Sequence, residues 1–270
     1  MLPALIAMPI FNEERHLEKV LREVRAATPA DILVINDGST DSTAAILARH
    51  RDVQVCHHAR NQGYGQSLID AFHWAAQRDY EWVITMDCDE QHEPAMLPEF
   101  LAAAARDHAD IISGSRYLNH APGADVPPPD RRQINREITA LLNRRLELNL
   151  TDSFCGFKAH RVSAMQRLRL TEPGYAFPMQ LWVEAVRCRL RIVEIPVRLI
   201  YTDPNRHFGG VLDDPKRRLR HYLRVFEEAL AAAELARAGA APRCVIGRPG
   251  RRQAGRWRCR VVARCQDPCH

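Results

Sequence analysis

The sequence predicts an α/β fold in which a mainly parallel, twisted sheet carries helices on both faces of a single domain. Short runs rich in apolar and β-branched residues alternate with amphipathic segments from the first residues onward. Strand and helix repeated in this order favour right-handed βαβ units and therefore parallel strands. With 270 residues, 46% of them hydrophobic, the chain is long enough to bury one sizeable core.

Each element can be placed in order along the chain. The expected strands are the apolar runs at residues 4–9, 31–37, 53–58, 81–87, 109–115 and 191–200. The expected helices are the amphipathic segments at 13–27, 41–50, 65–78, 97–105 and 131–150, and a last one that begins at Arg217. Ligands of such sheets bind in the crevice at the carboxyl ends of the strands, so those ends are where functional residues are expected.

The charge of the chain is uneven. The formal net charge is +5, from 38 basic and 33 acidic residues, yet nine arginines and one acid lie between Arg237 and His270. We therefore expect one folded domain over residues 1–237 and an Arg/Cys-rich, disordered tail over residues 238–270. The alternative is that the tail is attracted to an anionic membrane surface. The nearly neutral body predicts no nucleic-acid partner.

The sequence also predicts a cytoplasmic protein. No apolar run approaches the roughly 18 residues of a membrane-spanning helix, and the N-terminus lacks the basic start and cleavage site of a signal peptide. Cysteines 56, 88, 155 and 188 are scattered singly, as is typical of reduced thiols.

Three polar clusters follow expected strands, and we expect them to lie near one another. They are PIFNE at residues 9–13, NDGSTD at 36–41 and DCD at 87–89. The first two have a structural alternative: Glu13 can favour the positive end of the next helix, and Asp-Gly with Ser, Thr or Asp can form a turn and a helix N-cap.

The DCD cluster is harder to explain structurally. Asp87 and Asp89, two positions apart at a strand end, point to the same side and repel each other unless a cation lies near them. Hard oxygen ligands select Mg²⁺ or Mn²⁺, ions that complete their shell with substrate phosphates and water. The segment predicts a metal–phosphate site.

Five motifs in order carry a family resemblance. PxxNE, NDGSTD, DCDEQH, GSRY at 114–117 and DSFCGFK at 152–158 resemble the family 2 glycosyltransferases of the GT-A (Rossmann-like) fold. Within that family the sequence is most similar to the dolichyl-phosphate mannose synthase and polyprenyl-phosphate glycosyltransferase branch, over roughly residues 3–230. The resemblance implies an inverting, metal-dependent enzyme that moves a sugar from a nucleoside-diphosphate sugar to an acceptor.

The resemblance also implies a role for each matching residue. Pro9, Phe11 and Glu13 would border the base and ribose, and Asp37 would hydrogen-bond the base. Asp87, Asp89 and Gln91 would hold Mg²⁺ or Mn²⁺, and Arg116 would contact a phosphate. The implied nucleotide-binding set comprises Pro9, Phe11, Glu13, Ile35, Asp37, Asp87, Cys88, Asp89, Arg116 and Arg206.

The sequence departs from this branch in two places. Glu90 and Glu93 add acids beside the cation-binding pair, and Glu90 is expected to face solvent, with contact to the outer shell of the metal as the alternative. Arg206 matches an arginine of a loop near the phosphates, but the lysine expected six residues later is Leu212. Lys216 or Arg217 is a candidate replacement.

Three weaker signals leave alternatives open. NQGYG at residues 61–65 suits either a phosphate cradle or a tight turn before a helix. The pair His57-His58 is expected to be polar surface, with a ligand role as the alternative. The basic helix at 131–150 has either a solvated charged face or, by the resemblance, a place beside the acceptor and the membrane.

The chemistry depends on what attacks the sugar. A polyprenyl phosphate is largely ionised at neutral pH and needs no general base, whereas a hydroxyl acceptor requires one. The candidate base is Asp152, with Glu184 behind it, so the candidate catalytic residues are Asp87, Asp89, Arg116 and Asp152. The alternatives from other classes are a nucleotidyltransferase and a non-catalytic module that binds nucleotide sugars.

Overall fold

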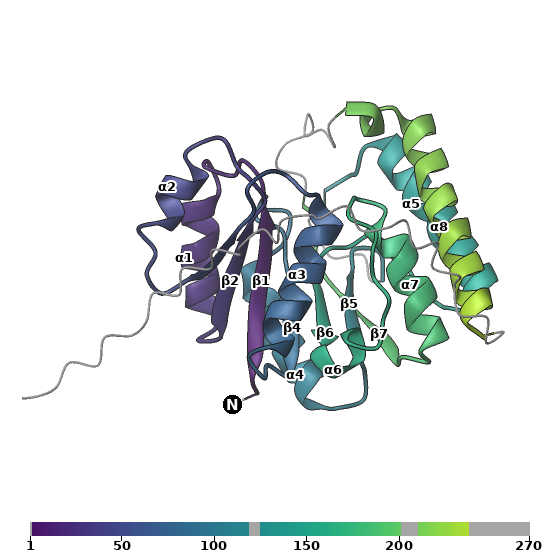
Figure 1. Cartoon of the computed structure of the whole chain (residues 1–270), viewed down its shortest axis with the longest axis horizontal. Helices are drawn as coiled ribbons and strands as arrows, with labels where there is room; N and C mark the ends of the chain where they lie inside the picture. The colour runs from purple at the N-terminus through teal and green to yellow at the C-terminus, as the bar shows by residue number, and fades with distance from the viewer. Residues whose placement is uncertain (1, 119–124, 201–209, 238–270) are drawn as a thin grey trace, which may run out of the picture.

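One seven-stranded sheet, enclosed by helices, organises the protein (Figure 1). The computed structural model describes residues 2–118, 125–200 and 210–237. The strands are β1 (Ala4–Ile10), β2 (Asp31–Asn36), β3 (Gln54–His57), β4 (Trp82–Thr85), β5 (Ile111–Ser115), β6 (Lys158–Arg161) and β7 (Ile192–Pro196). The helices are α1 (Leu17–Ala27), α2 (Thr43–Leu47), α3 (Tyr64–Ala76), α4 (Leu97–Ala105), α5 (Pro129–Leu146), α6 (Val162–Met165), α7 (Phe177–Arg187) and α8 (Pro215–Arg237), with 3-10 turns at Pro94–Met96 and Gly210–Asp213.

The strand order is β3-β2-β1-β4-β6-β5-β7. Strands β1, β2, β3 and β4 pair in parallel, as do β5 and β7, whereas β6 runs antiparallel between β4 and β5. The prediction of a mainly parallel sheet is confirmed. Parallel pairing brings the carboxyl ends of β1, β2 and β4 to one edge, where the three polar clusters begin.

Alternating side chains of the central strands supply two separate cores. Leu5 and Leu33 face the layer that contains α3, α5, α7 and α8, while Ile6 and Ile32 face the layer that contains α1, α2 and α4. All four of these side chains are fully buried. Because both faces of β1 and β2 are apolar, both must be covered, which accounts for helices on each side of the sheet. Figure 1 shows α5 and α8 beside each other, at the opposite end of the molecule from α1 and α2.

Strand β6 and helices α6 and α7 were not predicted from the sequence. Strand β6 is only four residues long and reads KAHR, a polar segment, yet Lys158 and His160 are buried between β4 and β5. Helix α7 begins with a proline in its first turn and buries Phe177 and Trp182 against the core. The first predicted helix starts at Leu17 rather than Glu13, whose carbonyl oxygen accepts a hydrogen bond from the Leu17 amide.

Several predictions fall outside the described residues. Arg206 and the tail at 238–270 both lie there, so the division into a domain and a disordered tail stays a prediction. Within the described part of the chain, no helix combines the length and the apolar character that a bilayer crossing requires.

Candidate active site

The loops after β1 and β2 are joined by hydrogen bonds at the carboxyl edge of the sheet. Asn12 adopts a left-handed conformation with φ of 58°, and its side-chain oxygen accepts from the amide of Thr40 at 2.8 Å. The amide of Asn12 donates to the Ser39 hydroxyl at 2.9 Å, and the amide of Glu13 donates to the Thr43 hydroxyl at 3.0 Å. The first two predicted clusters therefore form one unit.

Asp37 lies at the centre of this unit, and its carboxylate is 4% exposed. One oxygen accepts from His58 Nδ1 at 2.6 Å and from the Gln62 amide at 2.7 Å, and the other accepts from the Gly63 amide at 2.8 Å. The resemblance implies that Asp37 binds the nucleotide base. The observed contacts make it the anchor of the loop at residues 58–63, and its role toward the base stays a prediction.

His58 is a buried cation, not the polar surface residue predicted from the sequence. Its Nε2 forms an ion pair with Asp70 Oδ2 at 2.9 Å, so the imidazole bridges Asp37 at the end of β2 and Asp70 on α3. Burial disfavours the charged ring, but the hydrogen bonds to the two aspartates outweigh it and raise the pKa of His58 to about 11. The pair of negative charges thus encloses one positive charge.

The NQGYG segment forms a tight turn, and two of its amide groups already have partners within the protein. The amides of Gln62 and Gly63 donate to Asp37, and that of Gln66 donates to the carbonyl of Pro173 at 3.0 Å. Gly63 has φ of +106°, and a side chain there would collide with the Pro173 carbonyl oxygen at 2.3 Å. The glycine allows the chain to turn against the segment around Pro173.

Asp87 has neighbours from two other parts of the chain. Its amide donates to His92 Nδ1 at 2.9 Å, and its carboxylate oxygen Oδ2 lies 3.8 Å from His92 Nε2. The hydroxyl oxygen of Tyr64, at the start of α3, lies near the Asp87 carboxylate, since a side chain at Gly156 would meet both, at 2.8 Å and 2.7 Å. Burial and this carboxylate raise the pKa of Tyr64 well above its ordinary value, so the phenol stays protonated. The Asp87 side chain is 29% exposed and therefore open to a ligand.

The acidic neighbours of Asp87 separate into two groups. Asp89 accepts from the amide of Gln91 at 3.1 Å and is 7% exposed. Glu90, with φ of 61°, instead reaches His16 Nδ1 at 3.1 Å and Lys19 Nζ at 2.8 Å around α1. Glu90 was expected to face solvent; it pairs with α1 because its left-handed backbone turns it away from Asp87 and Asp89.

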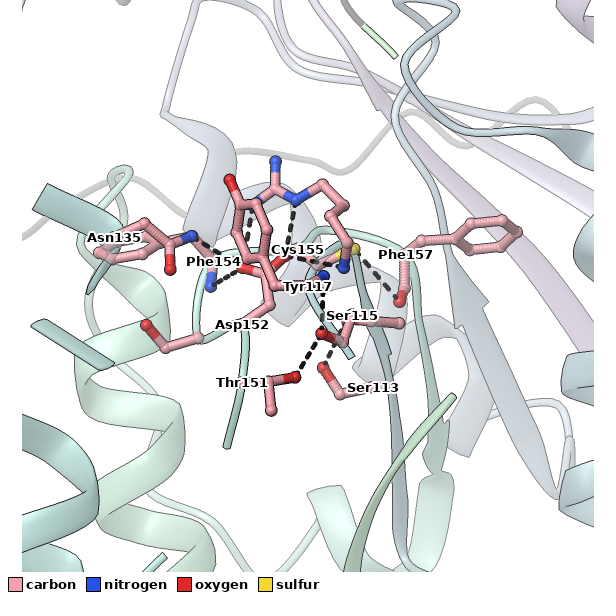
Figure 2. A network of polar contacts seen from close by, with 12 residues as sticks. Ser113, Ser115, Tyr117, Asn135, Thr151, Asp152, Phe154, Cys155 and Phe157 are labelled. Carbon is pink, nitrogen blue, oxygen red and sulfur yellow. Dashed lines mark hydrogen bonds and ion pairs between the residues drawn. The ribbon is translucent and has the colours of Figure 1, made fainter. Parts of the chain in front are cut away.

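Arg116 and Asp152 form a second ion pair of the site, in which the carboxylate is fully buried (Figure 2). The guanidinium donates from Nε to one carboxylate oxygen at 2.6 Å and from Nη2 to the other at 2.9 Å. Figure 2 shows Asn135 directed at the same carboxylate, to which it donates at 2.8 Å. The amides of Asp152 and Thr151 donate in turn to Glu194 on β7.

These contacts do not suit the general base predicted for Asp152. Burial alone would raise its pKa, but Arg116 and Asn135 hold the pKa of Asp152 well below its usual range. A general base near neutral pH needs a higher proton affinity and access to the reacting group, and the Asp152 side chain is fully buried. Glu184 is also a structural residue, because it accepts from Arg187 and from the amide of Arg169.

The remaining predicted residues are placed as follows. Phe11 is 44% exposed at the end of β1, where a ring can contact a bound base. The side chains of Ile35 and Cys88 are buried in the core, so any contact they make with a ligand would come through the backbone. Sequence reasoning missed Lys158, which is buried on β6 and donates to the Cys155 carbonyl. Burial lowers the pKa of Lys158.

The donor set at Asp87 and Asp89 suits a divalent cation that arrives with a diphosphate. Across residues 2–118, 125–200 and 210–237, no three His, Cys, Asp or Glu side chains are grouped as the ligands of a resident metal. Mg²⁺ commonly binds through one or two carboxylates together with substrate phosphates and water. Two aspartates at a strand end, one of them partly exposed, fit that pattern.

Comparison with known proteins identifies the class. The described fold is that of the GT-A glycosyltransferases. Glucosyl-3-phosphoglycerate synthase from Mycobacterium tuberculosis, solved with Mn²⁺, UDP and phosphoglyceric acid, superposes with a TM-score of 0.58 at 18% identity, covering 88% of this chain and 79% of that one. S. aureus TarS in complex with UDP-GlcNAc gives a TM-score of 0.56 at 17% identity, covering 88% and 71%.

The sequence comparison identifies the family. The model of the family described as glycosyl transferase family 2 matches residues 5–169. Undecaprenyl-phosphate mannosyltransferase of Micrococcus luteus is 30% identical over 222 residues, covering 78% of this chain and 89% of that protein. Polyprenol monophosphomannose synthase of Mycolicibacterium smegmatis is 31% identical over 204 residues, covering 72% and 76%. The chain belongs to glycosyl transferase family 2, and it is a glycosyltransferase.

The buried His58 predicts an unusual dependence of stability on pH. Replacing His58 by Gln leaves two buried carboxylates facing each other and should cost about 3 kcal/mol of unfolding free energy at pH 6. Because the pKa of His58 is about 11 when folded and near 6.5 when unfolded, its contribution is full below pH about 6.5 and is lost as the pH rises toward 11.

The difference in melting temperature between the wild type and His58→Gln should therefore narrow steadily from pH 7 to pH 10. Calorimetric scans of both proteins in the same buffers measure it, since other titrating groups affect both alike. His57→Gln, at the exposed neighbouring residue, is the matched control and should change little. A constant difference across this range would contradict the doubly paired cation.

Proposed function

We propose that this protein transfers a mannosyl group from a nucleoside-diphosphate mannose to a polyprenyl phosphate, with inversion at the anomeric carbon and with Mg²⁺ or Mn²⁺ bound. The donor class is supported by the paired aspartates at the carboxyl edge of the sheet and by the complexes of the GT-A neighbours. The sugar and the acceptor are supported by the two polyprenyl-phosphate relatives, each similar over most of its own length.

The observation that carries the acceptor class is the ion pair of Arg116 and Asp152. A hydroxyl acceptor needs a base, and the carboxylate predicted for that role is buried and held as an anion by Arg116 and Asn135. A phosphate monoester has a second pKa of about 6, so its oxygen is already ionised at neutral pH. The site thus suits an acceptor that brings its own nucleophile.

The residues of the site have separable tasks in this mechanism. Phe11 and the unit formed by the loops after β1 and β2 would receive the nucleoside, and Asp87, Asp89 and Gln91 would hold the cation on the diphosphate. The cation, when bound, supplies Lewis-acid stabilisation of the departing diphosphate. Arg116 keeps its charge beside the site and would orient the acceptor phosphate. Arg206, which lies outside the described residues, is the other candidate for this task.

The transfer itself is a single displacement. An oxygen of the acceptor phosphate forms a bond to the anomeric carbon while the bond from that carbon to the diphosphate breaks. The electron pair of the broken bond leaves with the nucleoside diphosphate, and no proton needs to be moved. Attack on the face opposite the leaving group inverts the anomeric configuration.

A lipid-linked acceptor also requires the enzyme to act at a membrane surface. Lys216, Arg217 and Arg220 are exposed at the start of α8 and can contact anionic headgroups, each contributing about 1 kcal/mol. We include this peripheral contact, on the cytoplasmic side, in the proposal.

The proposal is tested with the purified full chain, labelled sugar donors and two acceptors that differ only in their headgroup. Mannose from GDP-mannose or UDP-mannose should be transferred to undecaprenyl phosphate in detergent, but not to undecaprenol, and excess EDTA should stop the transfer. UDP-glucose and UDP-GlcNAc serve as competing donors. Coupling constants of the product should show the anomer opposite to that of the donor. Preferential transfer to the alcohol, or retention of configuration, would contradict the proposal.

Asp89→Asn should abolish transfer without unfolding the protein. The amide oxygen of Asn can still accept from the Gln91 amide, but it lacks the charge that a divalent cation requires. We expect kcat/KM to fall by at least about 100-fold, or ~2.7 kcal/mol in the barrier, with a melting temperature close to that of the wild type. Asp52→Asn, which removes a surface partner of Arg25, is the control for loss of a carboxylate. Turnover of Asp89→Asn within a few-fold of the wild type would argue against a ligand role.

A further inference from the structure

Tyr64 is the first residue of α3 and the side chain that joins the two acidic parts of the site. The residues just before it, Gln62 and Gly63, donate their amides to Asp37. The hydroxyl of Tyr64 itself lies near the carboxylate of Asp87, because both border the space at Gly156. Three consecutive residues therefore connect the carboxylate after β2 with the carboxylate after β4.

The backbone around Tyr64 is held rigidly against the segment before α7. A side chain at Gly63 would meet the Pro173 carbonyl oxygen at 2.3 Å, and one at Gly65 would meet the Glu172 carbonyl oxygen at 2.2 Å. Only glycine on each side of Tyr64 permits this close approach. A hydrogen bond from the Gln66 amide to the Pro173 carbonyl oxygen then holds the two segments together. The position of the Tyr64 side chain is thereby set by main-chain packing.

Packing against one face of the Tyr64 ring also fixes its position. It stacks on Tyr175 with ring centroids 5.8 Å apart and an interplanar angle of 17°. Stacked aromatic pairs of this geometry are favourable beyond the area that they bury. Removing the hydroxyl alone would therefore leave the ring in place.

The hydroxyl and the carboxylate share a space that only a glycine leaves open. A side chain at Gly156 would lie 2.7 Å from Asp87 Oδ2 and 2.8 Å from the Tyr64 hydroxyl oxygen. His92 accepts from the Asp87 amide and places Nε2 3.8 Å from the carboxylate. The Asp87 carboxylate thus has His92 and Tyr64 as side-chain neighbours and borders the space at Gly156.

We infer that Tyr64 is a positioning residue for the metal–diphosphate site: its hydroxyl orients the Asp87 carboxylate toward the cation. This inference rests on the proposed function only for the role of Asp87 as a metal ligand. Groups that orient metal ligands commonly contribute 10–100-fold to metal affinity. Nothing in the motifs distinguished this tyrosine from a residue of a simple turn.

The test uses binding, not turnover, as its main measurement. Mn²⁺ is titrated into the full chain with saturating GDP or UDP, whichever the wild type binds, and bound Mn²⁺ is followed by electron paramagnetic resonance. Tyr64→Phe should weaken Mn²⁺ binding by about 10-fold or more, while the melting temperature without metal stays near that of the wild type. Gly156→Ala, which places a methyl group between the hydroxyl and the carboxylate, should weaken it similarly.

Tyr80→Phe is the matched control. The hydroxyl of Tyr80 donates to an aspartate, Asp31, at 2.6 Å, but Asp31 begins β2 and so lies at the opposite edge of the sheet. Removing that hydroxyl should leave Mn²⁺ affinity unchanged. The replacement of tyrosine by phenylalanine is thus compared at two tyrosine–carboxylate pairs.

The outcomes separate this inference from the proposed function. If the wild type transfers mannose but Tyr64→Phe binds Mn²⁺ as well as the wild type does, the positioning role is wrong. A lower melting temperature with unchanged Mn²⁺ affinity would assign Tyr64 a packing role and overturn the inference as well. If Mn²⁺ and nucleotide bind and the variants weaken binding, but polyprenyl phosphate is not glycosylated, the inference holds and the proposed acceptor is wrong.

Discussion

The accumulation of negative charge at one edge of the sheet is the constraint on which the rest of the structure depends. Parallel pairing of β1, β2 and β4 brings Asp37, Asp87 and Asp89 to the same edge, and Asp152 approaches from the loop after α5. Buried carboxylates that repel one another destabilise a fold unless donors or cations compensate them. The chain supplies those partners residue by residue.

Two of the carboxylates are paired with buried cations of the protein itself. His58 lies between Asp37 and Asp70, and Arg116 binds Asp152 through both of its oxygens. Each pair links elements that are far apart in the sequence, so the same contacts that satisfy the charges also fix the loops. The Asp37 pair secures the turn before α3, and the Asp152 pair secures β5 to α5 and, through Glu194, to β7.

The sequence was sufficient to predict the elements and sites that depend on local patterns. It was insufficient where partners distant in the chain determine the structure or role of a residue. Apolar runs identified the parallel strands, and the spacing of Asp87 and Asp89 identified the candidate metal site. Strand β6 was missed because a short segment reading KAHR becomes a strand only between two neighbours. His58 looked like surface because its two partners lie 21 and 12 residues away in the chain. Asp152 was recognised as important, but its role depends on the geometry of Arg116.

The kind of partner that each carboxylate receives separates supporting acids from ligand acids. A guanidinium or imidazolium neutralises a carboxylate, so the carboxylate attracts an external cation less strongly. A phenol or a backbone amide orients a carboxylate and leaves its charge in place. Asp37 and Asp152 each accept from a cation of the first kind at 2.6 Å. Asp87 instead lies near the Tyr64 hydroxyl, with His92 Nε2 farther away at 3.8 Å, and Asp89 accepts from the Gln91 amide. Since all four acids occupy one region, this difference would direct the divalent cation of the proposed mechanism to the pair after β4, where a bound diphosphate would complete its coordination.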